Sequence, residues 1–265
     1  MTWDPVQYLR FGNQRLRPAL DLLARVPLGE PQEVIDLGCG AGNVTQALRR
    51  RWPAMSTRIT GIDSSPEMLA RARAEEPSAA WLQADIARWA PATAVDLIFS
   101  NAALHWLPGH VALIARLMGF LKPGGVLALQ MPNQTAAASH QCIGESIEAA
   151  ALDAPSKENL RARQVAPLAR LQDYYDWVAP QAASVDQWET VYTHVLEAAA
   201  AGSSAVAEWT RSTSLQPVLA AVPEALRAGF WEDYCRRVNA AYPARADGTT
   251  LFPFRRFFMV AQRHN

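Results

Sequence analysis

Short apolar runs alternate with helix-like segments over the first half of the chain. Residues 34–37, 59–63 and 95–100 have the length and apolar content of buried strands, whereas residues 43–51 and 110–120 repeat apolar positions at helical spacing. The same criteria predict further strands at 81–83 and 126–131, a helix at 66–74 and a turn at 122–125. Strands that alternate with helices are typical of a parallel sheet covered by helices. The pattern therefore predicts an α/β fold built on a doubly wound sheet.

The pattern changes after residue 132. Residues 135–178 are rich in alanine and mostly helical, 188–196 alternate like a strand, and 205–242 are helical again. Residues 255–262 have the pattern of one more strand. We therefore expect a seven-stranded, mostly parallel sheet with a helical cap formed by insertions. The predicted division is a core with an N-terminal helical segment at 1–132, cap insertions flanking a strand near 188–196 within 133–254, and a final core strand at 255–265.

Composition narrows the function classes. Lysine plus arginine and aspartate plus glutamate each number 25, so a basic surface for nucleic acid or a membrane is not expected. No run approaches the ~18 apolar residues of a membrane span, and the first residues lack the pattern of a signal peptide. Cys39, Cys142 and Cys235 are scattered and show no metal-ligand spacing. We expect a cytoplasmic protein, a monomer or small homo-oligomer, that acts on a small molecule without a metal.

A glycine-rich segment connects the first predicted strand to the first predicted helix. Its sequence from Asp36 to Asn43 is D-L-G-C-G-A-G-N, and glycines let the backbone approach a ligand because no Cβ intervenes. The following helix presents unpaired N–H groups. Such a loop alone is compatible with a nucleotide, a flavin or a plain turn. Asp63, however, ends the second strand 21 residues after Gly42, where a carboxylate can accept both hydroxyls of a ribose.

The acid precedes the first glycine, so the loop reads D-x-G-x-G-x-G instead of the G-x-G-x-x-G of many NAD oxidoreductases. In this form it resembles the class I S-adenosylmethionine-dependent methyltransferases. The resemblance implies a Rossmann-like sheet, a loop that holds the methionine end of the cofactor, and ribose binding by Asp63. Asp85 and Ile86 match the family's adenine-binding step, although Asp85 is also explained as a turn or capping residue.

Further segments narrow the resemblance. Residues 3–5 (W-D-P), 61–66 (G-I-D-S-S-P), 105–108 (H-W-L-P), 130–132 (Q-M-P) and 256–261 (R-F-F-M-V-A) are similar to the trans-aconitate 2-methyltransferase family. The resemblance implies cofactor contacts from Asp36, Gly38, Cys39, Gly40, Asn43, Asp63, Ser64, Asp85, Ile86, Asn101, Ala102 and Trp106. It implies substrate contacts from Tyr8, Phe11, Arg15, Arg17, Trp106, Tyr192, His194 and Arg256. One departure is Gln216, which stands where that family has an arginine.

The chemistry implied by this resemblance is methyl transfer from a sulfonium to a carboxylate of a small polycarboxylic acid, with trans-aconitate as the favoured acceptor. An ionised carboxylate needs no general base, so positioning and desolvation should dominate. His105 and His194 are candidate bases or hydrogen-bonded core residues. Arg255 and Arg256 occupy consecutive strand positions, so only one should face the substrate. Gln216 keeps open another small acid or a hydroxylated metabolite as acceptor, and a non-catalytic S-adenosylmethionine-binding protein is the alternative from another class.

Overall fold

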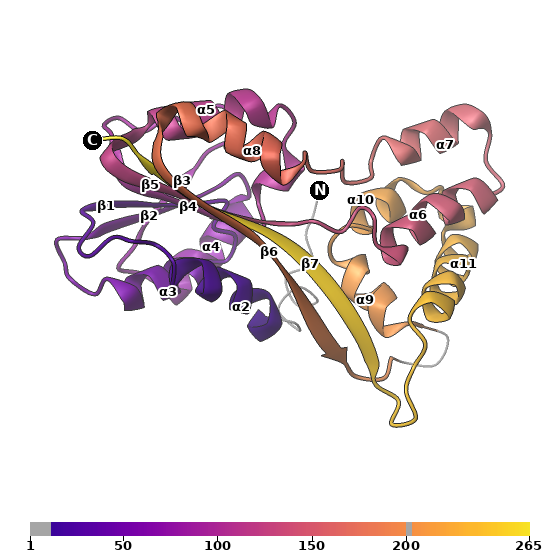
Figure 1. Ribbon diagram of the computed structural model, residues 1–265. Coiled ribbons are helices and arrows are strands. Elements are labelled where there is room, and N and C mark those ends of the chain that lie inside the picture. The colour runs from indigo at the N-terminus through magenta and orange to yellow at the C-terminus, as the bar shows by residue number, and fades with distance from the viewer. Residues whose placement is uncertain (1–11, 200–202) are drawn as a thin grey trace. The chain divides into compact units, whose positions relative to one another are not determined.

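The computed structural model describes residues 12–199 and 203–265, with side chains described from residue 16 onward (Figure 1). The chain divides into two compact units. The sheet unit contains Arg15–Pro132, Ala169–Thr190 and Arg256–Asn265. The helical unit contains Asn133–Leu168 and Val191–Arg255, together with the described residues before Arg15.

The described residues form a seven-stranded sheet with the order β3-β2-β1-β4-β5-β7-β6. The strands are β1 (Glu33–Leu37), β2 (Arg58–Asp63), β3 (Ala80–Gln83), β4 (Val95–Asn101), β5 (Leu121–Pro132), β6 (Ala182–Leu196) and β7 (Thr250–Arg263). Neighbouring strands from β3 to β5 pair in parallel, and β7 pairs with β5 antiparallel. The predicted α/β class and mostly parallel sheet are confirmed. The strand order reverses next to β1, which is where such sheets bind ligands at the carboxyl ends of their strands.

Helices cover both faces of the sheet unit. The helices are α2 (Gly12–Leu23), α3 (Asn43–Arg51), α4 (Pro66–Glu75), α5 (His110–Gly119) and α8 (Leu171–Val178), with short 3-10 turns η1 (Leu104–Trp106) and η2 (Ala179–Gln181). α5 and α8 lie on one face, and α2, α3 and α4 lie on the other (Figure 1). The start of α4 follows from its sequence, because the Ser65 hydroxyl accepts from the Met68 N–H at 3.2 Å and Pro66 opens the first turn.

The prediction of a turn at 122–125 is wrong, because these residues form an irregular part of β5. Val95 pairs with Leu121 and Leu97 with Val126, so the strand carries extra residues opposite Asp96. Gly124 supplies the positive φ of 71° that the irregularity needs. Lys122 Nζ holds the Asp96 carboxylate at 2.8 Å, which fixes the irregular segment to β4.

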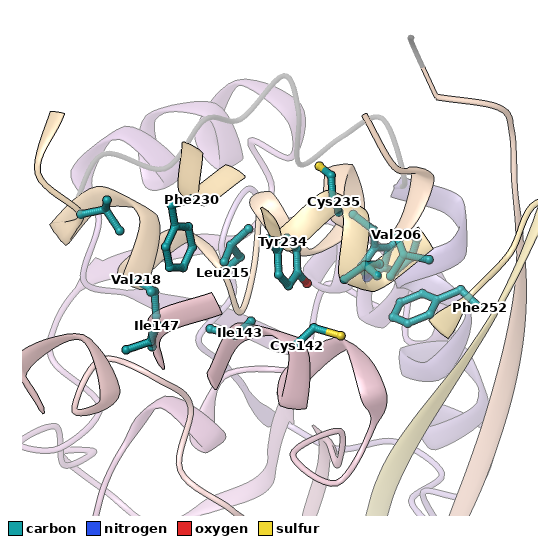
Figure 2. Close-up of a cluster of buried hydrophobic side chains, with 14 of the residues drawn as sticks. Cys142, Ile143, Ile147, Val206, Leu215, Val218, Phe230, Tyr234, Cys235 and Phe252 are labelled. Carbon is teal, nitrogen blue, oxygen red and sulfur yellow. The ribbon is translucent and has the colours of Figure 1, made fainter. Parts of the chain in front are cut away.

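The helical unit has a hydrophobic core of its own. Its helices are α6 (Ala138–Ala149), α7 (Ala154–Arg161), α9 (Ala205–Arg211), α10 (Gln216–Ala221) and α11 (Glu224–Ala241). Figure 2 shows side chains of α6, α9, α10 and α11 meeting with Phe252 in this core. The buried Tyr234 hydroxyl lies 2.9 Å from Thr210 Oγ1 and donates to the Ser139 carbonyl, so its polar atom is satisfied. Within the described residues, no helix combines the length and the apolar character that crossing a membrane requires.

Residues 169–190 differ from the expected division of the chain. The sequence pattern predicts that they belong to the cap, whereas α8 packs against α5 in the sheet unit. The ring centroids of Tyr174 in α8 and Phe257 in β7 lie 4.8 Å apart, and this contact explains why α8 belongs to the sheet unit. β6 also begins earlier than the predicted strand at 188–196. The prediction missed its first residues because they are mostly small or polar and show no alternation of apolar positions. The boundary between the units falls inside β6 and β7, after Thr190 and after Arg255.

Candidate functional site

The glycine-rich loop connects β1 to α3 and adopts a conformation that requires glycine. Gly38, Gly40 and Gly42 have φ angles of +81°, +53° and +87°, which lie in the left-handed region. The N–H groups of Gly38 and Cys39 both donate to the carbonyl oxygen of Ile62, at 2.8 and 2.9 Å. The loop is therefore fixed to the end of β2 by its own backbone.

Gly38 also marks a close approach between three segments. A Cβ at this position would lie 2.2 Å from Ala103 Cβ and 3.4 Å from Ile86 Cδ1. The loop after β1 thus touches the segment after β4 and the turn after β3. These segments carry the predicted cofactor residues, and the structure brings them together at the carboxyl edge of the sheet.

Asp63 at the end of β2 is held by two backbone donors. Gly40 N donates to its Oδ2 and Ser65 N donates to its Oδ1, each at 2.9 Å. The carboxylate is half-buried, and each oxygen keeps a lone pair for a further hydrogen bond. The arrangement can therefore present both oxygens to neighbouring hydroxyls of a ribose. It also gives Asp63 a structural role in the loop that the sequence did not indicate.

Asp36 lies buried beneath the same loop. Thr45 Oγ1 donates to its Oδ2 at 2.6 Å. Burial raises the pKa of Asp36 to about 7; the Thr45 hydrogen bond opposes this, and the nearby Asp63 charge adds to it. Burial, with the same two acids, also raises the pKa of the Cys39 thiol, which keeps the thiol protonated. Asp36 is consequently a carboxyl group that changes charge near neutral pH.

Replacing Asp36 with asparagine is expected to flatten the pH dependence of stability. Between pH 3.8 and about pH 7, Asp36 keeps its proton in the folded protein but has lost it in the unfolded chain. The free energy of unfolding therefore falls as pH rises through this window. The slope from one such group approaches 1.4 kcal/mol per pH unit. Asparagine keeps an acceptor for the Thr45 hydroxyl but does not titrate. In urea unfolding of the ligand-free proteins, the free energy of unfolding of the variant relative to that of the wild type should increase as pH rises from about 5 to 7. A constant difference would contradict the raised pKa.

The segment after β4 is conformationally constrained. Ala102 has a φ of +53°, a left-handed conformation that alanine rarely adopts, and its N–H donates to the Gln130 carbonyl at 2.9 Å. The Ser100 hydroxyl donates to the Leu37 carbonyl at 2.8 Å, which joins β4 to β1. Asn101 Oδ1 is buried and has no hydrogen-bond partner among the described residues. A buried acceptor without a partner at this edge fits a ligand donor.

The turn after β3 is held from α5. Asp85 Oδ1 accepts from the Ala87 N–H at 2.9 Å, so a turn role is present, and its adenine contact stays a prediction. Arg116 donates to the carbonyls of Ile86 at 2.7 Å and Trp89 at 3.2 Å. Arg116 thereby positions Ile86, a function that the sequence analysis missed. The only signal was one arginine within the apolar pattern of 110–120.

Hydrogen bonds between Tyr174 and His110 and between His110 and Leu104 support η1, which carries His105 and Trp106. The Tyr174 hydroxyl lies 2.5 Å from His110 Nδ1, and His110 Nε2 lies 3.0 Å from the Leu104 carbonyl oxygen. A carbonyl only accepts, so His110 Nε2 donates to the Leu104 carbonyl oxygen. No local sequence signal indicates this contact, because Tyr174 lies far from His110 in the chain.

The two arginines of β7 face opposite ways. Arg255 is exposed, whereas Arg256 is 4% exposed and its Nη1 donates to Gln130 Oε1 at 3.2 Å. Gln130 pairs in register with Asn101 of β4. Arg256 therefore lies at the same edge of the sheet as the segment after β4, and its contact with a substrate stays a prediction.

The remaining predicted substrate residues are distributed over the chain. Tyr8, Phe11 and the Arg15 side chain lie outside the described residues, and Arg17 is exposed on α2. Tyr192 and His194 belong to the helical unit. The buried His194 ring stacks on the Trp209 ring, with 4.5 Å between the ring centroids. That contact favours a packing role for His194.

The predicted cofactor residues, in contrast, all belong to the sheet unit. The observed features fit a nucleoside with a charged tail: a cradle that a Cβ would fill at Gly38, a carboxylate oriented by two N–H groups at Asp63, and an unpartnered acceptor at Asn101. Within the described ranges, no group of three or more His, Cys, Asp or Glu side chains is arranged to hold a metal ion.

Comparison with known proteins adds to this geometry. Residues 34–125 match the family described as a methyltransferase domain. The chain is 46% identical over 263 residues to the trans-aconitate 2-methyltransferase of Azoarcus sp. (strain BH72), with 99% of each chain covered. It is 47% identical over 265 residues to the protein of the same name from Paracidovorax citrulli (strain AAC00-1), with 98% of each covered.

Solved structures of much lower identity share the fold. The phosphoethanolamine N-methyltransferase 2 of Haemonchus contortus, in complex with S-adenosyl-L-methionine, is 17% identical with a TM-score of 0.56, covering 94% of this chain and 53% of that one. The N-methyltransferase NodS of Bradyrhizobium japonicum WM9, in complex with S-adenosyl-L-homocysteine, is 15% identical with a TM-score of 0.50, covering 96% and 88%. At these identities the likeness concerns the fold alone.

Proposed function

Because the chain belongs to the trans-aconitate 2-methyltransferase family, we propose that it transfers a methyl group from S-adenosylmethionine to a carboxylate oxygen of trans-aconitate. The alignment at 46% identity over nearly the whole chain carries this proposal, and it confirms the resemblance predicted from the residues. The residues that the sequence analysis assigned to the cofactor meet at one edge of the sheet, which supports it further.

Residues of the sheet unit would hold each part of the cofactor. Asp63 would take the ribose hydroxyls, the loop from Gly38 to Gly42 would hold the methionine end, and Asp85 with Ile86 would face the adenine. S-adenosylmethionine supplies an electrophilic methyl group when it is bound. The protein's own contribution is to hold Asp63 in place through Gly40 and Ser65, and to hold Ile86 through Arg116.

The acceptor needs alignment more than proton transfer. A carboxylate is already ionised at neutral pH, so no side chain has to remove a proton from it. Positioning two groups in a reactive geometry can supply roughly 7–11 kcal/mol of a barrier. The carboxylates that do not react keep their charge and need fixed positive partners in a closed site. Arg256 is buried and cationic, which suits it to this task.

A second candidate acceptor follows from Gln216. This residue begins α10 in the helical unit and is half-buried. Glutamine cannot form the bidentate, charged contact of the arginine that the family resemblance leads us to expect there. A less charged acid or a hydroxylated metabolite is therefore the alternative acceptor.

Incubation with methyl-labelled S-adenosylmethionine and a panel of acids tests the proposal. The panel contains trans-aconitate, related di- and tricarboxylates, and monocarboxylic and hydroxylated metabolites. Mass spectrometry is expected to show a labelled monomethyl ester of trans-aconitate. Turnover of a neutral or monocarboxylic metabolite with none of trans-aconitate would contradict the acceptor and leave methyl transfer standing.

The turnover number at saturating cofactor is expected to be nearly flat between about pH 6 and pH 9, since the acceptor carboxylate stays ionised there. Saturation matters because Asp36 changes charge near pH 7 beneath the cofactor loop. A hydroxyl acceptor would instead need a base and give an acid limb near the ordinary histidine pKa of about 6.5. A steep acid limb that disappears in His105→Gln or His194→Gln would contradict carboxylate methylation.

We also propose a cytoplasmic location, and a monomer or small homo-oligomer that acts on a small-molecule acid without a nucleic acid or a membrane as partner. Cys39, Cys142 and Cys235 are all free and buried, which supports a reducing compartment.

A further inference from the structure

Gln130 is a polar side chain in the buried, otherwise apolar part of β5. It is fully buried, and its neighbours from Val126 to Met131 are apolar. Its Oε1 accepts from Arg256 Nη1 at 3.2 Å. Its Nε2 is buried and has no hydrogen-bond partner among the described residues. Half of the amide is thus accounted for, and the donor half is left for a ligand.

Arg256 determines which way this amide points. A guanidinium only donates hydrogen bonds, so Gln130 must turn its oxygen toward Arg256 and its NH₂ group away from it. Gln130 and Arg256 come from adjacent antiparallel strands, where Gln130 pairs with Phe258 and Pro132 pairs with Arg256. Positions two residues apart lie on the same face of a strand, so both side chains share one face of the sheet. The result is a cation and an oriented N–H donor side by side.

The location of this pair connects it to the reaction. Gln130 pairs in register with Asn101, and the Gln130 carbonyl accepts from the Ala102 N–H. The segment after β4 in turn touches Gly38 of the cofactor loop. The pair therefore lies at the cofactor's edge of the sheet, with β4 between it and β1.

We propose that Gln130 and Arg256 together bind one carboxylate of the substrate, the Gln130 Nε2–H group donating to a carboxylate oxygen while its Oε1 holds the Arg256 guanidinium in place. This inference rests on the proposed function and names a specificity-determining residue for it. The bound carboxylate is one that keeps its charge, because an oxygen paired with a guanidinium is a weaker nucleophile. The pair thus selects acids that carry a carboxylate besides the one that reacts.

Gln130→Glu separates this role from a purely structural one. A glutamate is the same size and would form an ion pair with Arg256, which would serve as well as the amide if Gln130 only supported that arginine. In substrate binding the same change replaces a donor with a negative charge and cancels the charge of Arg256. We expect KM for trans-aconitate to rise 10- to 100-fold, with S-adenosylhomocysteine affinity and melting temperature nearly unchanged.

The matched control is Gln181→Glu, which adds the same charge at a half-buried glutamine of the sheet unit that donates to the Ala115 carbonyl. Its KM should stay within about twofold of wild type. Gln130→Leu and Arg256→Ala should each raise KM for trans-aconitate, with a smaller effect on any monocarboxylic acid that the enzyme turns over. Calorimetric titration of trans-aconitate into the S-adenosylhomocysteine complex gives a second readout that does not depend on turnover.

Unchanged KM and unchanged trans-aconitate affinity in a folded Gln130→Glu variant would overturn the role of Gln130. Turnover of trans-aconitate by the wild-type protein would still uphold the proposed function in that case. If the wild-type protein neither methylates nor binds any acid of the panel, both inferences fail. If it acts on a different di- or tricarboxylate, the same variants are measured with that acid, and the same rise in KM is expected.

Discussion

Replacing Asp63 with alanine is expected to weaken the binding of S-adenosylhomocysteine by about 2–4 kcal/mol, the scale of lost charge-assisted hydrogen bonds. Both oxygens of Asp63 are already oriented by the N–H groups of Gly40 and Ser65. The substitution therefore removes the ribose acceptors and also releases the loop that would hold the methionine end. Isothermal titration calorimetry measures the effect directly.

Two controls isolate the cofactor contact. Asp186→Ala removes an exposed acid that pairs with Arg25 in the same unit, and it should leave cofactor affinity unchanged. Thermal unfolding without ligand shows how much the loop itself has loosened. NAD should not bind to the wild-type protein in the same experiment. Full affinity for S-adenosylhomocysteine in a folded Asp63→Ala variant would rule out Asp63 as the ribose ligand.

Replacing Gly38 with alanine is expected to destabilise the protein by roughly 2–5 kcal/mol and to abolish cofactor binding. A left-handed alanine costs about 1–2 kcal/mol, and overpacking adds about 1–3 kcal/mol. The new methyl group would lie 2.2 Å from Ala103 Cβ, so the loop after β1 and the segment after β4 would have to separate. Urea unfolding and calorimetric titration measure the two effects.

Two other glycines separate steric overlap from backbone strain. Gly40 has a φ of +53° but open space where a Cβ would lie, so Gly40→Ala should show the strain of about 1–2 kcal/mol alone. Gly119, the last residue of α5, has open space and no positive φ, so Gly119→Ala should be nearly neutral. Equal destabilisation in Gly38→Ala and Gly40→Ala would show that the contact with Ala103 is unimportant.

The sheet and the cofactor loop were predictable because their signals are local. Strand periodicity depends on neighbouring residues, and β1, β2 and β4 match their predicted ranges to within one residue at each end. The loop from Asp36 to Asn43 combines a glycine pattern with its place between a strand and a helix. Its chemistry can be inferred because such a position brings backbone N–H groups to a ligand.

Contacts between distant parts of the chain were not predictable in this way. Arg116 holds the turn after β3, and Tyr174 supports η1 through His110, but neither partner is a sequence neighbour. Gln130 is visible in the sequence as a glutamine within an apolar strand, and a buried glutamine needs a hydrogen-bond partner. Its partner could not be identified from the sequence, because Arg256 of β7 lies far away in the chain.

The pairing of β5 with β7 has a consequence for synthesis on the ribosome. β5 ends at Pro132 and β7 begins at Thr250, so residues 133–249 must be translated before the two strands can join. Until then, β5 presents an apolar edge with unpaired N–H and C=O groups, the kind of edge that recruits other chains into aggregates. Nascent chains stalled in this interval should therefore depend on chaperones, and a fragment of residues 1–132 should be poorly soluble although it contains every predicted cofactor contact.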